Sequence, residues 1–242
     1  MPVAMRVFGY VEDLDLEFTS ADRPALVTAL LAHCAGGGAD HWWAQPVGTR
    51  IATLLHLFMF YEGSDRIELS ARCMRAECGE PFGFDLPLRE LAARAPQGET
   101  WEVALPSGRG VTLRRPIGRD LSRWRAARPA TREQALCMML DDLILHGRPE
   151  PGEEAAMADA VIECDPLVAL TVAAECPVCG HAHDIAVDVE GLVLAHFGSR
   201  QRAMLHDVHR LATHYGWTEQ QVLGVPPPRR AVYLALIDGQ IR

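Results

Sequence analysis

Four of the seven cysteines in this 242-residue chain form two short pairs with the spacing of a metal-binding knuckle. Four residues separate Cys73 from Cys78, two separate Cys176 from Cys179, and a glycine follows each pair. In a zinc knuckle a tight turn directs two sulfurs at one metal ion, and glycine supplies the positive φ that the turn requires. Four thiolates complete the closed tetrahedral shell of a structural site. The sequence therefore predicts one structural zinc ion shared by these four cysteines.

Two other interpretations of the pairs stay open. The cysteines could be small buried residues of metal-free knuckles, or His181 or His183 could replace one of the sulfurs as a ligand. The distance along the chain between the pairs is a weak objection to a shared ion. Loop closure costs only about 0.6 kcal/mol for each doubling of loop length.

Residues at every second position on both sides of each pair are apolar, with one histidine among them. Before the pairs they are Ile67, Leu69 and Ala71, and Leu170, Val172 and Ala174; after them they are Phe82, Phe84, Leu86 and Leu88, and His183, Ile185, Val187 and Val189. This period is that of a strand with one buried face. Each knuckle is thus predicted at the tip of a β-hairpin, and the hairpin recurs about 100 residues later as an internal repeat.

The remaining pattern predicts an α+β protein in which helices surround a zinc-ribbon-like core of these two hairpins. Helices are expected over about 24–35, 47–61, 88–95, 119–126, 131–145, 153–163, 188–215, 218–225 and 229–237, the long one near the C-terminus carrying a buried stripe. A second kind of hairpin is expected over 101–115. Residues 1–19 could add an edge strand, and Trp42 and Trp43 fall in a polar link.

Four segments follow from these elements, and the zinc ion would hold them as one globular unit. They are an N-terminal extension, 1–19; a first helix pair with its knuckle hairpin, 20–100; a β-hairpin and helical insert, 101–163; and a second knuckle hairpin with the C-terminal helices, 164–242.

Composition and charge favour a bacterial cytoplasmic protein. The net charge of −9 disfavours nucleic acid and acidic membranes as partners. The segment 1–18 lacks a secretory pattern, and the longest apolar run, 52–61, is too short to span a bilayer. Cys34, Cys137 and Cys164 are scattered, which favours reduced thiols over a disulfide framework.

Arginine is concentrated in the segment 109–128. The residues are Arg109, Arg114, Arg115, Arg119, Arg123, Arg125 and Arg128, with Trp124 among them. The cluster could bind nucleic acid, or it could dock on an acidic protein partner, for which Arg114, Arg115, Arg119 and Arg123 are the candidates. It could also be a solvated face balanced by nearby acids.

A second candidate for partner contact is the segment 215–237. It is short, interrupted by three prolines, and contains Trp217, Arg229 and Tyr233, residue types that are enriched at protein interfaces. The alternative is that these side chains pack on the protein's own core.

No constellation of residues demands catalysis. The sequence has no His-x-Glu element of a zinc deaminase, no glycine-rich nucleotide loop after a strand and no nucleophile elbow. His206 and His209 share a helix face, but a half-exposed polar pair explains them better than a metal site. We therefore expect a non-enzymatic protein without a small-molecule substrate.

Several stretches of the chain resemble a cysteine-knuckle protein family. They are WAQPVGTR at 43–50, the first knuckle with Gly79, VTLRRPIGRD at 111–120, CPVCG at 176–180, HDVHRLA at 206–212, YGWTE at 215–219 and RRAVYL at 229–234. The resemblance covers most of 25–242. It departs from the family at Cys73 and Cys78, where two intervening residues would be usual.

The genes of that family lie among tail and baseplate genes of contractile-tailed phages and phage-like contractile injection systems. The resemblance therefore implies a structural or assembly component of a contractile tail or baseplate. Its partners would be other tail, baseplate or assembly proteins, and it could be incorporated in an assembled particle. The alternative is a zinc-ribbon nucleic-acid-binding protein that uses the arginines of 109–128.

Overall fold

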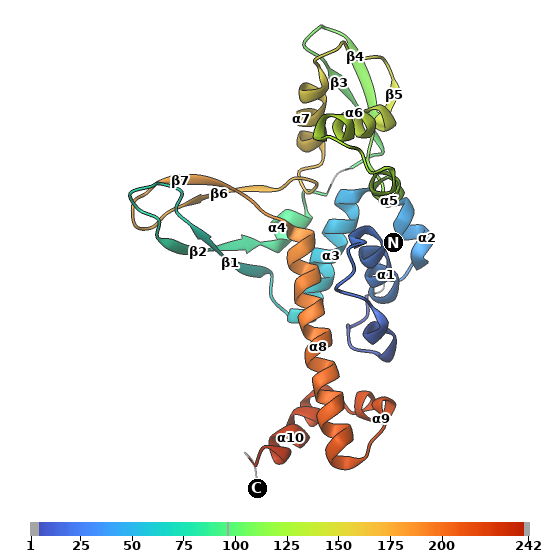
Figure 1. Ribbon diagram of the computed structural model, residues 1–242, viewed down its shortest axis with the longest axis vertical. Coiled ribbons are helices and arrows are strands. Elements are labelled where there is room, and N and C mark those ends of the chain that lie inside the picture. Colours follow the sequence, from blue (N-terminus) through green and yellow to red (C-terminus); the bar gives the residue numbers. More distant parts are fainter. Residues whose placement is uncertain (1–4, 96, 240–242) are drawn as a thin grey trace.

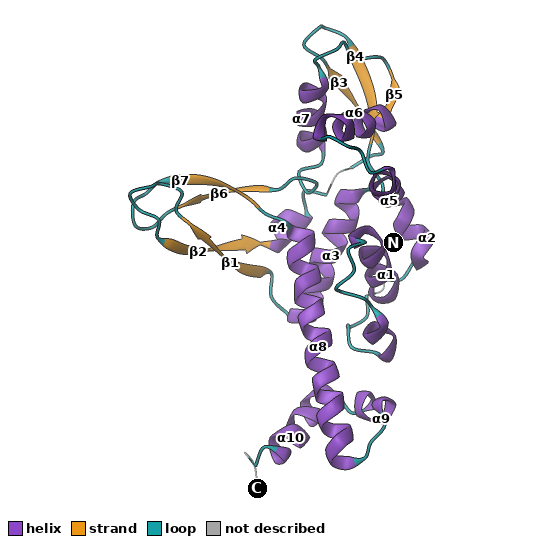
Figure 2. Ribbon diagram, in the orientation of Figure 1, coloured by secondary structure: helices purple, strands orange, loops and turns teal. Residues whose placement is uncertain are grey.

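The long helix α8 (Val189–Tyr215) is the element along which the other parts of the molecule are arranged (Figure 1). The computed structural model describes residues 5–95 and 97–239. A helical body packs on the first half of α8, an arm of two hairpins projects from it, an α+β insert lies at one end, and a C-terminal lobe lies at the other. The expected α+β class is confirmed, with strands confined to the arm and the insert (Figure 2).

The body buries the main apolar core of the described residues. Its elements besides α8 are η1 (Val11–Asp15), α1 (Arg23–Cys34), α2 (Gly38–Ala44), α3 (Val47–Glu62) and α4 (Leu88–Ala92). Helix α3 is apolar on most of its surface and is buried on nearly all sides, with residues 50–55 buried consecutively, as expected of a central core helix. The helix ends at Gly63, whose φ of 67° favours glycine. Leu30, Leu54, Val193 and Phe197 are fully buried where α1, α3 and α8 meet.

The N-terminal segment differs from the expected edge strand. Residues 11–15 form the 3-10 helix η1, and its Asp13 is completely buried. The Asp13 carboxylate accepts hydrogen bonds from both Nη atoms of Arg6 and from the backbone N–H groups of Gly9 and Tyr10. Burial alone would raise the pKa of Asp13, but these hydrogen bonds outweigh it and hold the pKa below its ordinary value. The alternation of Leu14 with acids therefore reflects a carboxylate anchor and not strand pairing.

The expected polar link around Trp42 is also wrong, because these residues form helix α2. Trp42 is 2% exposed, and its indole N–H donates to the carbonyl of Gly36 at 2.6 Å. Three consecutive glycines, residues 36–38, have positive φ, so the chain turns sharply into the helix, whose first residue is Gly38.

The insert folds around a second apolar cluster. Its elements are β3 (Thr100–Ala104), β4 (Gly110–Arg114), α5 (Gly118–Ala127), α6 (Arg132–Leu143), β5 (Ile144–His146) and α7 (Glu154–Cys164). The sheet order is β3-β4-β5, with antiparallel neighbours; β5 was not expected from the sequence. Val111, Leu113, Trp124 and Met157 are buried in this cluster. The insert thus has its own core beside that of the body.

The C-terminal lobe consists of the end of α8 with α9 (Glu219–Gly224) and α10 (Pro227–Ile237). Asp188 caps the start of α8 by accepting from the N–H of Gly191, and Gly216 ends the helix with a φ of 69°. Val208, Leu211 and Val222 form the buried core of the lobe.

Candidate metal centre

Two antiparallel hairpins form the arm. They are β1 (Arg66–Arg72) with β2 (Pro81–Pro87), and β6 (Thr171–Glu175) with β7 (Ala182–Ala186). The predicted alternation holds in all four strands, since the residues expected to face inward are buried or half-buried and those between them are exposed or less buried. Phe82, Phe84, Ala174 and Ile185 contribute to one small cluster together with the four cysteines, so the two hairpins pack face to face. The internal repeat is therefore confirmed as a pair of facing hairpins.

Each hairpin ends in a turn closed by backbone hydrogen bonds. In the first, the N–H of Cys73 donates to the carbonyl of Glu80, and the N–H of Gly79 donates to that of Arg75. In the second, the N–H of Gly180 donates to the carbonyl of Cys176 at 2.8 Å. Gly79 and Gly180 have φ values of 60° and 67°, so both turns use the glycine for left-handed backbone. The turns place all four sulfurs at the end of the arm.

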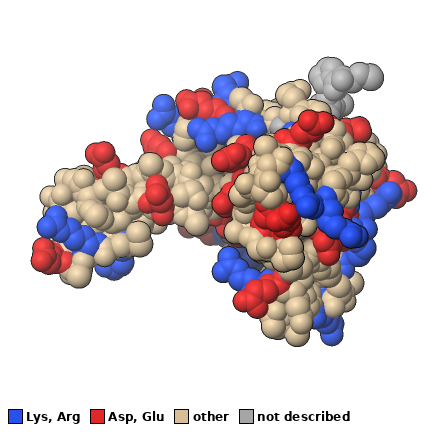
Figure 3. Space-filling model, turned by 90° about the horizontal axis from the view of Figure 1, so that it is seen from above, with Lys and Arg blue, Asp and Glu red and all other residues tan. Residues whose placement is uncertain are grey.

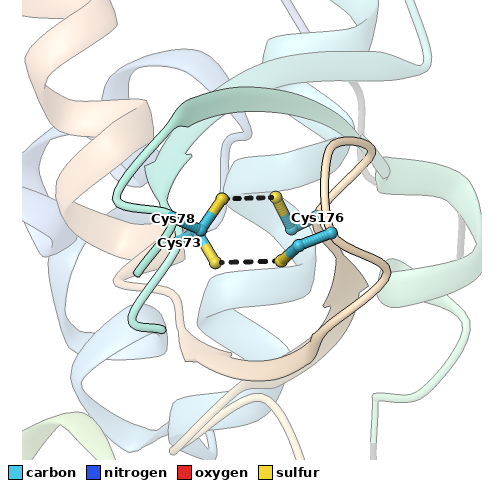
Figure 4. Close-up of side chains that lie close together, drawn as sticks. Cys73, Cys78 and Cys176 are labelled. Atoms are coloured by element: carbon cyan, nitrogen blue, oxygen red, sulfur yellow. Dashed lines mark hydrogen bonds between the residues drawn. The ribbon is translucent and has the colours of Figure 1, made fainter. Parts of the chain in front are cut away.

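The four sulfurs converge on one point (Figure 4). All four Sγ atoms lie within 4.8 Å of one another. The Sγ atoms of Cys73 and Cys179 are 3.6 Å apart, and those of Cys78 and Cys176 are 3.8 Å apart. Zinc–sulfur bonds of about 2.3 Å in a regular tetrahedron require sulfur–sulfur edges of about 3.8 Å. The donor set therefore fits a single tetrahedral metal ion, as the cysteine spacing predicted.

A buried histidine lies next to the cluster. His183 is 3% exposed, and its Nε2 is 3.3 Å from the Sγ of Cys73. The ring stacks on Phe82, with centroids 5.9 Å apart, and His181 is exposed beside it. The group of mutually close ligand atoms consists of the four sulfurs, so His183 is placed as a hydrogen-bonding neighbour of a thiolate. The sequence placed this residue on the inward face of its hairpin and indicated it as a possible substitute ligand.

The thiols of Cys73 and Cys176 differ in pKa. Burial raises the pKa of Cys73 to about 12. The backbone N–H of Cys179 stabilises the thiolate of Cys176 and lowers the pKa of Cys176 to about 7. A metal ion bound here must displace protons from the more basic thiols, so its binding would be coupled to proton release.

The predicted arginine cluster is divided between internal and exposed positions. Arg115 is 7% exposed and donates to the carbonyls of Gln97, Gly98 and Cys164, where the chain enters and leaves the insert. Arg109 pairs with Glu150 at the surface.

Acids pair with three other arginines of the cluster, as the alternative of a balanced face expected. Arg114 and Arg123 share the buried Asp120, and Arg123 also reaches Asp142. Arg119 pairs with the exposed Asp40 at 3.2 Å.

The predicted C-terminal contact residues also separate into two kinds. Trp217 and Tyr233 are half-buried and pack with Tyr215, the ring centroids lying 4.9–5.8 Å apart. Arg229 is exposed on α10. The aromatic rings thus belong to the small core of the lobe, and Arg229 faces the solvent.

Comparisons of this chain with family models, with curated proteins and with solved structures found no match. The resemblance to the baseplate family accordingly stays a hypothesis. Among residues 5–95 and 97–239, no helix combines the length and the apolar character that a bilayer crossing requires.

Proposed function

We propose that this protein is a non-enzymatic structural or assembly component whose arm is held together by a structural zinc ion. The ligands are Cys73, Cys78, Cys176 and Cys179. The observation that carries the proposal is the convergence of four sulfurs, from hairpins about 100 residues apart in sequence, within 4.8 Å of one another.

The choice of zinc rests on the ligand set. Tetrahedral sites with four thiolates select zinc or iron among the common metals. Four protein ligands fill a tetrahedral shell, whereas a catalytic zinc ion keeps one position for water or substrate. A shell of this kind stabilises the fold and leaves no position at which a substrate could bind.

The projecting arm suits a protein that docks on others. Met74 and Val178, one in each knuckle turn, are 71% and 66% exposed at the end of the arm. Exposed apolar side chains at the end of a projecting arm are candidates for contact with a protein surface. Together with the family resemblance, this supports a role in a contractile tail or injection-system baseplate, with tail, baseplate or assembly proteins as partners.

Elemental analysis of the purified protein tests the metal. We expect one zinc per chain, released when the thiols are titrated with a mercurial reagent. Cys176→Ser should lose the metal, whereas the control Cys137→Ser should retain it, because Cys137 is exposed on α6 away from the cluster. A folded protein purified without any metal, or with iron in its place, would refute the zinc assignment.

Co-expression with the proteins encoded beside it tests the assembly role. We expect a stable complex with a tail or baseplate protein that is lost in the double variant Met74→Glu, Val178→Glu. The matched control is Leu205→Glu, an exposed apolar position on α8. Neighbouring genes unrelated to contractile particles, or a complex that survives the arm variant and fails with the control, would contradict the proposal.

A further inference from the structure

We propose that a pocket between the body and the insert binds an acidic, partly apolar peptide segment of a protein partner. The pocket has a volume of about 590 Å³. The loop between α2 and α3 forms one wall, and β3, β4, β5 and the start of α5 form the rest. It holds the four arginines of the segment 109–128 that are candidates for docking on an acidic partner, which are Arg114, Arg115, Arg119 and Arg123.

The four arginines play different parts in this pocket. Arg115 donates through Nε, Nη1 and Nη2 to backbone carbonyls, and Arg114 donates to both oxygens of Asp120, so these two are engaged in the fold. The side chains of Arg119 and Arg123 are 57% and 54% exposed. These two remain accessible to a ligand.

The two accessible arginines are held to different degrees, Arg119 by one exposed carboxylate and Arg123 by two carboxylates. The partner of Arg119 is Asp40, whose side chain is 99% exposed, and surface pairs of this kind contribute little to stability. The hydrogen bonds of Arg123 to Asp120 and Asp142 are both made by its Nη2. A carboxylate of a ligand could therefore bind Arg119 in place of Asp40 and approach Arg123 from the open side.

The charge balance of the lining favours an anion. Four arginines line the pocket against two acids, Glu99 and Asp120. Asp120 is 3% exposed at its side chain and already accepts from Arg114, Arg123 and the N–H of Ile117. The lining itself therefore carries more basic than acidic groups, and an anionic ligand would compete with Asp40 and Asp142, which pair with Arg119 and Arg123 from outside the lining. Guanidinium groups bind carboxylates through paired hydrogen bonds, which makes an acidic side chain the matching ligand.

Apolar side chains in the same pocket favour a peptide over a nucleic acid. Pro46, Ile117 and Leu145 line it, and Leu145 is 45% exposed. Nucleic-acid sites gain affinity from many phosphate contacts along a basic surface. On the face seen in Figure 3, basic and acidic side chains are interspersed, with no continuous basic stripe. A segment with one or two carboxylates beside an apolar side chain fits both parts of the pocket.

This inference is independent of the metal, because no cysteine of the cluster lines the pocket. Selection from a random peptide library on the full-length protein, followed by fluorescence anisotropy with the most enriched synthetic peptide, tests it. We expect enriched peptides that combine Asp or Glu with Leu, Ile or Phe. Their affinity should fall about tenfold or more in Arg119→Glu and in Arg123→Gln. Leu145→Ser should weaken binding severalfold.

The control is Arg132→Glu, which makes the same charge change at an exposed position outside the pocket. Circular dichroism and thermal unfolding establish that each variant is folded. No enrichment, enrichment without acidic residues, or binding that persists in both arginine variants would overturn the proposal. A short DNA duplex that binds more tightly than the peptide and is lost in the same variants would overturn it in favour of nucleic acid.

Discussion

Removal of the metal is expected to unfold the outer part of the arm and leave the body folded. The arm has few apolar contacts of its own, since its cluster contains three buried residues, Cys73, Phe82 and Cys176. Burial of a phenylalanine side chain contributes about 2–3 kcal/mol. Fixing the backbone of a single residue costs about 1–2 kcal/mol, so burial of Phe82 offsets the ordering of only about one to three residues. Two-stranded hairpins are marginal by themselves.

A structural zinc ion would change this balance. Zinc in zinc-finger peptides supplies about 10–16 kcal/mol of apparent binding free energy at neutral pH, and this becomes folding free energy. The base of the arm does not depend on it, because Leu86, Leu88 and Leu170 are buried in the core of the body. The effect of metal loss should therefore be graded along the hairpins, strongest at the knuckles and weak where β1, β2, β6 and β7 leave the body.

Hydrogen exchange read by mass spectrometry measures this gradient. After chelation, or in Cys176→Ser, peptides covering 71–82 and 174–183 should exchange faster by orders of magnitude. Peptides from α1, α3 and the first half of α8 should stay protected, and Cys137→Ser should match the unaltered protein throughout. Knuckle peptides that remain as protected as the body without metal would refute the reasoning. Concerted unfolding of arm and body would refute it equally.

Three further perturbations probe the packing that holds the parts together. Gly48→Ala should destabilise the fold by about 1–3 kcal/mol in thermal unfolding, because a Cβ there would clash with Oδ1 of the buried Asp165. The control Gly224→Ala places its Cβ in open space and should be neutral or stabilising in the same assay. Arg115→Met should cost about 1–3 kcal/mol by leaving carbonyls at the neck of the insert unpaired, and limited proteolysis should then cut near 97 and 164. Asp13→Asn should cost about 2 kcal/mol at neutral pH. The pKa of Asp13 is lower in the folded than in the unfolded protein. Its contribution to the free energy of unfolding is therefore complete above the unfolded pKa of about 4 and is lost as the pH falls through the lower folded value. The free energies of unfolding of the unaltered protein and of Asp13→Asn should converge in acid.

The knuckle hairpins could be predicted from the sequence because their signals are local. Cysteine spacing fixes the turns, and the period of two at Ile67, Leu69, Val172 and Ile185 marks one buried face of each hairpin. The helices other than η1 and α2 followed for the same reason, with α8 ending at its glycine. Convergence of the two pairs on one point then required only that the hairpins face each other.

The expectations that failed depend on contacts between distant segments. The alternation at residues 14–18 resembles a strand, but the buried Asp13 and its bonds to Arg6 set the local backbone. Two of the acids that pair with the arginines likewise lie outside the cluster, with Asp142 lying 19 residues from Arg123 and Asp40 lying 79 residues from Arg119. Strand β5 is three residues long beside a Pro- and Gly-rich turn, too short for a periodic pattern. No local rule identifies such partners.

The positions of the arm and the pocket lead to one last expectation, which separates the two proposed contacts. The arm tip would owe its shape to the proposed metal ion. The pocket is built instead from the loop after α2 and from the insert, whose core includes Leu113 and Trp124. Cys176→Ser should therefore abolish partner binding through Met74 and Val178 and leave the affinity for an acidic peptide unchanged. Conversely, Arg119→Glu should weaken the binding of the peptide and leave the metal content unchanged. Anisotropy measures peptide binding in Cys176→Ser, and hydrogen exchange shows whether the body of this variant stays folded. If the body stays protected and peptide binding is nevertheless lost, the pocket and the metal centre are coupled and are not independent.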